Sequence, residues 1–148
     1  MSNRLDDLWA EGRAPAWDGL FRADGRSRDA EVDGPHLTGF VLGEPADLDE
    51  LMTEDPEWTT SVGIFAEAEL PGGSGRLYGG GGSHGSEGLF ARFDADGRAV
   101  WLLHLSDSNE FVRIGVEWPL ATFTNNLGES LTVDLTGPDF GPDLGPVG

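Results

Sequence analysis

Hydrophobic and polar positions alternate with a period of two along much of the C-terminal half of the chain. Residues 112–118 alternate in this way, residues 131–135 repeat the pattern, and residues 99–105 are apolar at nearly every position. A period of two indicates a half-buried strand, and a continuous apolar run suits a strand covered on both faces. Polar turns separate these runs, so the sequence predicts an antiparallel meander from Gly88 to Leu135. The side chains expected on its inner face are Val112, Ile114, Trp118, Val133 and Leu135.

The segment Asp94-Ala95-Asp96-Gly97 is expected to close a hairpin within this meander. Glycine adopts a positive φ without steric cost, and aspartate side chains bond to nearby backbone N–H groups. The same four residues match the start of a calcium-binding loop, but Leu105 stands where that loop needs a final glutamate ligand. A hairpin turn is therefore the favoured interpretation.

Apolar spacing of three and four residues predicts two short helices in the N-terminal half. Leu5, Leu8 and Trp9 share one face after a possible cap at Ser2, and Gly12 is a stop signal. Asp47 is expected to cap a second helix, with Glu50 in the position of a capping box. Residues 15–21 fit a weak helix, or alternatively a strand over residues 17–22. Residues 24–36 are expected to form an exposed connection, and residues 36–42 and 59–70 to form strands.

Glycine dominates residues 71–88, with nine glycines among eighteen residues. We expect a brief strand at residues 76–78 followed by a flexible loop. Within the loop, Gly81-Gly82-Ser83-His84-Gly85 matches the G-x-S-x-G motif of serine hydrolases. That motif requires a strand before it, a helix after it and a parallel sheet around it, and the sequence predicts neither the helix nor the parallel sheet. The match is therefore interpreted as a glycine-rich loop.

These elements together predict an α+β fold that is mainly an antiparallel β-sheet, with short N-terminal helices. Residues 1–135 are expected to form a single globular domain, since this length can bury a hydrophobic core. Residues 136–148 alternate glycine, proline and aspartate and are expected to be an extended or disordered tail.

Charge and composition narrow the possible functions. The chain has 27 acidic and 9 basic residues, a net charge of −18 and no cysteine, and all its basic residues are arginine. No disulfide or thiolate chemistry is available, and no basic stripe is present to bind nucleic acid directly. No apolar run reaches the roughly 20 residues that a membrane helix needs, so a cytoplasmic location is expected. The acidity itself can reflect genome composition, adaptation to salt, or steering towards a basic partner.

No complete catalytic, metal or cofactor motif is found, because the three histidines lack the short spacing of zinc ligands. A non-enzymatic protein without cofactor is therefore favoured. In general character, being small, acidic, cysteine-free and sheet-rich, the chain resembles many bacterial immunity proteins that neutralise toxin domains. That resemblance implies a basic protein partner, such as a nuclease-type toxin, and involves no motif and no site residue.

Two sets of residues are candidates for binding. The densest acidic run beside an aromatic residue is the predicted partner-binding set, comprising Asp47, Asp49, Glu50, Glu54, Asp55, Glu57 and Trp58. Its alternative interpretation is a solvated helix face. The second hypothesis is a small-molecule-binding or enzymatic domain with a pocket under the 71–88 segment, lined by Tyr78, His84 and His104. A third hypothesis is a housekeeping protein whose acidity has no binding role.

Overall fold

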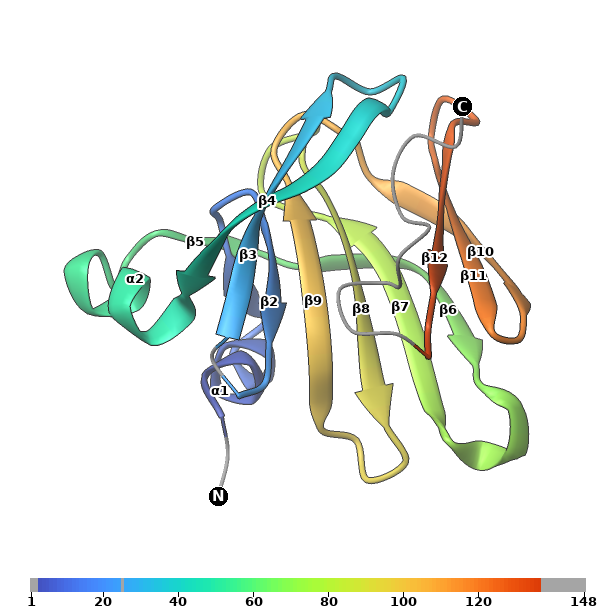
Figure 1. The fold of residues 1–148 in the computed structure, drawn as a ribbon, viewed down its shortest axis with the longest axis horizontal. Helices are drawn as coiled ribbons and strands as arrows, with labels where there is room; N and C mark the ends of the chain where they lie inside the picture. The colour runs from blue at the N-terminus through green and yellow to red at the C-terminus, as the bar shows by residue number, and fades with distance from the viewer. Residues whose placement is uncertain (1–2, 25, 137–148) are drawn as a thin grey trace.

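A seven-stranded antiparallel sheet forms the middle layer of the computed structural model, which describes residues 3–24 and 26–136 (Figure 1). The strand order is β4-β3-β2-β9-β8-β7-β6. In that order the strands are Thr38–Asp47, Arg26–Asp33, Gly19–Arg22, Ala99–Leu105, Gly88–Asp94, Gly75–Gly81 and Gly63–Glu69. Strand β9 lies at the centre and is buried along nearly all its length, as its continuous apolar sequence predicts.

A second, three-stranded antiparallel sheet covers one face of the large sheet. It consists of β10 (Phe111–Glu117), β11 (Leu120–Asn125) and β12 (Ser130–Asp134), drawn in orange to red in Figure 1. Aromatic side chains join the two layers: Phe90 of β8 stacks on Phe123 of β11 with 3.8 Å between ring centroids, and Phe111 meets Phe90 edge-on. These contacts lie in a core that also includes Leu103, Val133 and Leu135.

Two short helices and a two-stranded sheet cover the opposite face. The helices are α1 (Arg4–Ala10) and α2 (Leu48–Glu54), and the small sheet pairs β1 (Arg13–Pro15) with β5 (Thr59–Ser61). A one-turn 3-10 helix, η1 (Pro71–Gly73), lies between β6 and β7. Side chains from both helices meet the large sheet in a second core, whose members include Leu8, Met52, Leu89 and Leu102.

Both helices begin at capped positions. The side chain of Asn3 accepts the backbone N–H of Asp6 at the start of α1, and Gly12 has a φ of 73° just after the helix. The carboxylate of Asp47 accepts the backbone N–H groups of Asp49 and Glu50, so the predicted cap of α2 is confirmed. These bonds satisfy N–H groups that have no partner within a helix. The second helix lies between β4 and β5, so both helices are in the N-terminal half but only α1 is near the N-terminus itself.

The predicted meander is only partly formed. Strands β8 and β9 pair with each other in the large sheet, whereas β10, β11 and β12 form the separate small sheet. Val133 and Leu135 are buried as expected, but Val112 is 36% and Trp118 is 47% exposed. A bulge between Phe111 and Arg113 interrupts the in–out alternation of side chains along β10. Phe111 is therefore buried, and Val112 points outward.

Several N-terminal predictions are corrected by strand pairing. Residues 26–33, expected as an exposed connection, form β3, which pairs with both β2 and β4. Of the two interpretations of residues 15–22, the strand is the one observed, as β2. The expected strand over residues 59–70 divides into β5 and β6, which belong to different sheets. Strand β3 pairs with its neighbours in the chain, whereas the β1–β5 pairing joins distant residues such as Arg13 and Ser61, which local patterns do not reveal.

In the glycine-rich segment, the strand expected at residues 76–78 is longer than predicted, and the loop is limited to residues 82–87. Strand β7 includes Gly79, Gly80 and Gly81 and pairs with β6 and β8. A Cβ on Gly80 would lie 1.8 Å from the carbonyl oxygen of Gly63, and one on Gly79 would lie 3.3 Å from that of Phe111. Position 80 therefore requires glycine, because the neighbouring backbone passes too close for a side chain, and position 79 is tightly packed.

Two further predictions from the sequence concern the C-terminal tail and the absence of a membrane-spanning helix. The predicted tail at residues 136–148 lies almost entirely outside the described residues. Within residues 3–24 and 26–136, neither helix has the length and apolar character required to cross a membrane.

Candidate functional site

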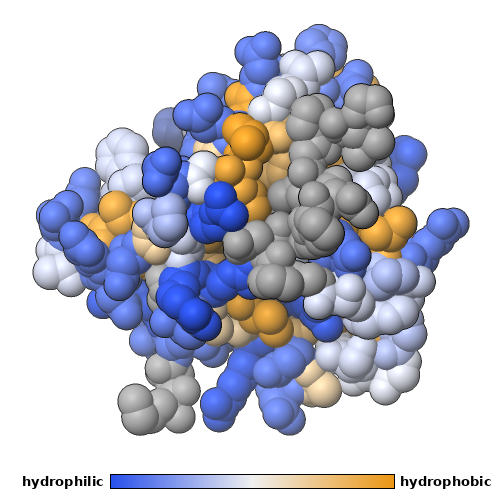
Figure 2. All heavy atoms as spheres, in the orientation of Figure 1, coloured by the Kyte–Doolittle hydropathy of each residue, from blue (hydrophilic) through white to orange (hydrophobic). Residues whose placement is uncertain are grey.

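The seven residues of the predicted partner-binding set lie together on α2 and the segment that follows it, and all seven are exposed. We call these residues, Asp47, Asp49, Glu50, Glu54, Asp55, Glu57 and Trp58, the acidic surface. Helix α2 projects at the left of Figure 1, and Figure 2 shows mainly hydrophilic residues over that part of the molecule. An ion pair on this surface joins Asp49 to Arg4 at 3.2 Å.

Amphipathic spacing explains why the acids point outward. Leu48 and Met52 are 1% and 3% exposed and anchor α2 on the large sheet, so the remaining positions face solvent. Trp58 is different, because it is a large aromatic residue that is 51% exposed in the segment beyond the helix. An aromatic side chain that is left half-exposed among acids is typical of a contact residue rather than a core residue.

A cavity of about 330 Å³ opens beside Trp58. Its lining includes Trp58, Thr60, Ser83, His84, Glu87 and Asp107. The structure thereby brings Trp58, from the predicted partner-binding set, to the same cavity as His84, from the alternative set. Sequence position separates these two residues, but β5 and the turn after β7 lie next to each other because Ser83 bonds to Thr60 and Ser61.

Glu87 forms the floor of this cavity and makes a buried ion pair with His104, which lies behind it. Oε1 of Glu87 lies 2.9 Å from Nε2 of His104, which is 1% exposed on β9. Oε2 of Glu87 accepts the backbone N–H of His84 at 2.8 Å and the hydroxyl of Thr60 at 3.0 Å. The carboxylate therefore joins the central strand, β5 and the turn of residues 82–87.

The other nitrogen of His104 also faces acceptors. Nδ1 lies 3.1 Å from the carbonyl oxygen of Trp17 and 3.6 Å from Oδ1 of Asp18. A neutral imidazole has only one N–H, whereas the imidazolium has two donors. Because both nitrogens face acceptors and neither faces a donor, the arrangement fits a protonated His104. Its positive charge is then compensated by Glu87 and by Asp18, whose carboxylate also accepts bonds from Ser106.

The titration of these groups follows from the same contacts. The hydrogen bond from His104 lowers the pKa of Glu87 to about 2, against the effect of burial. Burial alone lowers the pKa of His104, but the bonds and charges of Asp18 and Glu87 together raise it above the ordinary value of 6.5. Burial raises the pKa of Asp18, and the bonds from His104 and Ser106 outweigh it, so this pKa is lowered. All three shifts favour the charged forms.

These shifts predict how stability depends on pH. The contribution of Glu87 is complete above its ordinary pKa of 4.5 and is lost as the pH falls towards about 2. The contribution of His104 is complete below 6.5 and is lost as the pH rises through its raised pKa. Urea unfolding across this range should show both losses, and His104→Gln should remove the alkaline one. An alkaline loss that persists in His104→Gln would assign it to another group.

Ser83 does not form the nucleophile arrangement that its G-x-S-x-G motif suggests. Its hydroxyl accepts the backbone N–H of Ser61 and lies 3.2 Å from the hydroxyl of Thr60. A serine nucleophile needs a histidine within hydrogen-bond reach, and the ring nitrogens of His104 are taken by Glu87 and Trp17. The local geometry therefore makes Ser83 part of the turn that supports the cavity.

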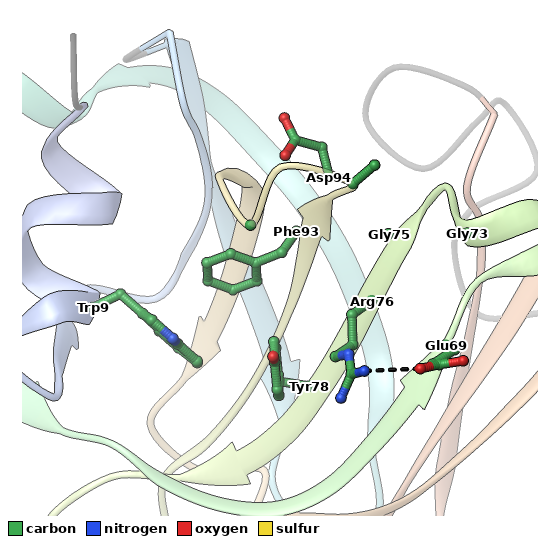
Figure 3. Close-up of a pocket in the computed structure, with 10 residues that line it drawn as sticks. Trp9, Glu69, Gly73, Gly75, Arg76, Tyr78, Phe93 and Asp94 are labelled. Atoms are coloured by element: carbon green, nitrogen blue, oxygen red, sulfur yellow. Dashed lines mark hydrogen bonds and ion pairs between the residues drawn. The ribbon is translucent and has the colours of Figure 1, made fainter.

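The three residues of the alternative pocket do not line one cavity. His84 lines the cavity beside Trp58, and His104 is buried behind Glu87. Tyr78 lies at a second cavity of about 340 Å³ between α1 and the two turns that precede β7 and follow β8, which lie at the same end of this strand pair (Figure 3). The remaining histidine, His36, lies 3.5 Å from Glu129. Within residues 3–24 and 26–136, no three side chains of the metal-ligating types form a group.

Sequence reasoning missed Glu87, Asp18 and Thr60, which together hold the cavity floor. One signal was present, because His104 stands in an otherwise apolar strand. An ionisable group in such a strand must find polar partners, since burying it unpaired is costly. Its partners come from positions 17 and 86 residues away, so the sequence could indicate that they exist but not which residues they are.

Comparison of the chain with protein-family models, with curated proteins and with solved structures finds no match.

Proposed function

We propose that this protein is a non-enzymatic binding module whose acidic surface docks on a basic protein partner. The observation that supports this proposal is the placement of the acidic surface: six exposed carboxylates on α2 and the segment around it precede a half-exposed tryptophan that lines a cavity. Tryptophan is among the residues that contribute most to binding at protein interfaces, and arginine is the cation that most often packs on its ring.

The mechanism is occlusion of the cationic surface of the partner. The net charge of −18 draws a basic protein towards the chain, and the acidic surface selects the orientation in which the two meet. An arginine of the partner then packs against Trp58 and enters the cavity, where Asp107 offers a carboxylate. A nuclease-type toxin, whose active site must attract phosphate, is the class of basic partner that best fits this surface.

The buried ion pair supports a binding role over a catalytic one. Glu87 already accepts three hydrogen bonds, and its pKa of about 2 keeps it ionised, so it is poorly suited to exchange protons at neutral pH. What the network does provide is a fixed cavity floor. A preformed cavity lowers the entropic cost of binding, because the loop need not be ordered when the partner arrives.

Capture experiments test this proposal. Immobilised protein should retain a basic protein from an extract of its native host, and the association rate should fall at least about tenfold from low to physiological salt. Trp58→Ala should weaken binding by about 2 kcal/mol or more, through faster dissociation. Glu50→Arg with Glu54→Arg should abolish capture, since both residues belong to the acidic surface.

A matched charge control separates docking from general electrostatics. Glu31→Arg with Glu117→Arg makes the same change in net charge at exposed positions on β3 and β10. This control should retain the partner with a modest loss of association rate. Equal losses in the two double variants, or association insensitive to salt, would contradict docking through the acidic surface.

A further inference from the structure

The second cavity, the one at Tyr78, shares no residue with the acidic surface. Three aromatic rings form one of its walls (Figure 3). Trp9 comes from α1, Tyr78 from β7 and Phe93 from β8. Their ring centroids lie 4.9 to 5.7 Å apart, and Tyr78 meets Phe93 edge-on. Because Trp9 and Tyr78 remain partly exposed at the cavity, this wall offers an apolar surface to a ligand.

Beside the rings, on the same face of the sheet, the cavity wall is polar and offers both hydrogen-bond donors and acceptors. Arg76 donates to Glu69 at 2.8 Å and to Glu67 at 2.9 Å, and Figure 3 shows its guanidinium between Tyr78 and Glu69. A guanidinium has five N–H donors, so these two bonds leave others for a ligand. Each carboxylate has further lone pairs, and Glu69 keeps most of its side chain in solvent.

The mouth of the cavity is kept open by glycines. Gly73 and Gly97 line it with φ angles of 69° and 79°, and nothing lies within 4 Å of the position that a Cβ would take. A residue other than glycine is strained at these angles. At these two positions the turns place no side chain in the cavity, which is also lined by Asp94 and Ala95 of the second turn.

The charged side chains of the lining, Arg76 with Glu69 and Asp94, influence which ligands fit. A cation would face the guanidinium of Arg76, and an anion would face Glu69 and the strongly negative field of the whole chain. A neutral ligand with hydroxyl groups avoids both penalties, because each hydroxyl donates and accepts. Such a ligand also needs an apolar face to lie against the rings.

We propose that this cavity binds a neutral saccharide, with the C–H face of one sugar ring against Trp9 and Tyr78 and its hydroxyls bonded to Arg76 and Glu69. An aromatic wall with a few convergent polar groups is the usual composition of a small-ligand site. This binding is independent of the proposed function, since it uses other residues and a ligand without charge.

Nuclear magnetic resonance of the ¹⁵N-labelled full chain tests the site with a fixed panel: glucose, galactose, mannose, N-acetylglucosamine, maltose and cellobiose. At least one sugar should shift the indole N–H signal of Trp9 and the amide signals of Gly75 and Tyr78 at millimolar concentration. The affinity should be the same at low and high salt, because salt does not screen a neutral ligand. Association with a basic partner is salt-dependent, so the two activities can fail separately.

Single substitutions test whether the sugar binds at this cavity. Trp9→Ala should abolish the shifts, and Glu69→Ala should weaken binding at least about tenfold. Glu69 is exposed, so its variant keeps the test valid if Trp9→Ala proves unstable by circular dichroism. Trp58→Ala at the other cavity should bind sugar normally. The proposal is overturned if no sugar of the panel shifts these signals, if Glu69→Ala binds as tightly as the unaltered chain, or if choline binds and no sugar does.

Discussion

Glu87→Ala should lower the free energy of unfolding by about 3–5 kcal/mol, the cost of leaving one member of a buried ion pair without its partner. The substitution removes the acceptor of Nε2 of His104 and the shared acceptor of the His84 N–H and the Thr60 hydroxyl. His104 is 1% exposed, so water cannot readily replace the lost carboxylate. Urea denaturation at pH 6 measures the change.

Two comparisons show whether the effect comes from the ion pair. Glu67→Ala removes an exposed carboxylate that pairs with Arg76 and should cost no more than about 1 kcal/mol. The double variant Glu87→Ala with His104→Ala should cost less than the sum of its two single variants, because the second change removes the stranded charge. Strictly additive costs would mean that the two side chains are not coupled.

The sequence pattern correctly predicted those elements that depend on residues close to one another in the chain. The cap of α2 at Asp47 and the hairpin between β8 and β9 depend on residues within a few positions of each other, and the pattern identified both. In that hairpin, Asp94 accepts the backbone N–H groups of Asp96 and Arg98, as its turn chemistry suggests. The double-sided burial of β9 was likewise evident from its unbroken apolar run.

Sheet membership was not evident, because it depends on pairing across the chain. Strand β9 pairs with β2, so the turn after Leu105 leads into a different sheet instead of continuing a meander. A polar turn looks the same in sequence whether it closes a hairpin or connects two layers. The bulge at Phe111 had no sequence signature either, and it reversed the expected orientation of Val112.

The two candidate sites differ in how far they could be predicted. The acidic surface was visible, because a dense run of carboxylates on a short helix is necessarily exposed. The saccharide cavity was not, since Trp9 and Tyr78 are 69 positions apart and meet only because α1 packs over the ends of β7 and β8. Its polar residues pair across neighbouring strands, Glu69 opposite Arg76 in the β6–β7 ladder.

The high glycine content was the sequence feature most easily misinterpreted. A high glycine content usually indicates flexibility, because glycine has the widest range of backbone conformations. In this chain several glycines are required for the opposite reason, as two backbones pass with no room for a methyl group. Gly88 repeats the situation of Gly80, since its Cβ would lie 2.1 Å from the carbonyl oxygen of Asn109.

Gly80→Ala should therefore destabilise the fold by about 3 kcal/mol, at the upper end of the usual cost of overpacking. The added Cβ would lie 1.8 Å from the carbonyl oxygen of Gly63 and 2.9 Å from its carbonyl carbon. Both are backbone atoms of β6, so no side chain can move aside and the β6–β7 ladder must separate. Urea denaturation measures the loss, and hydrogen exchange should show it first in the amides of β6.

Gly85→Ala is the matched control, because it lies in the same glycine-rich segment with nothing within 4 Å of the added atom. It should change stability by no more than about 0.5 kcal/mol. If the segment were a flexible loop, both substitutions would be equally harmless, and alanine would even reduce the entropy of the unfolded chain. A large difference between the two variants is expected only if β7 is packed against β6 as an ordered strand, which also fixes the position of Arg76 and Tyr78 at the saccharide cavity.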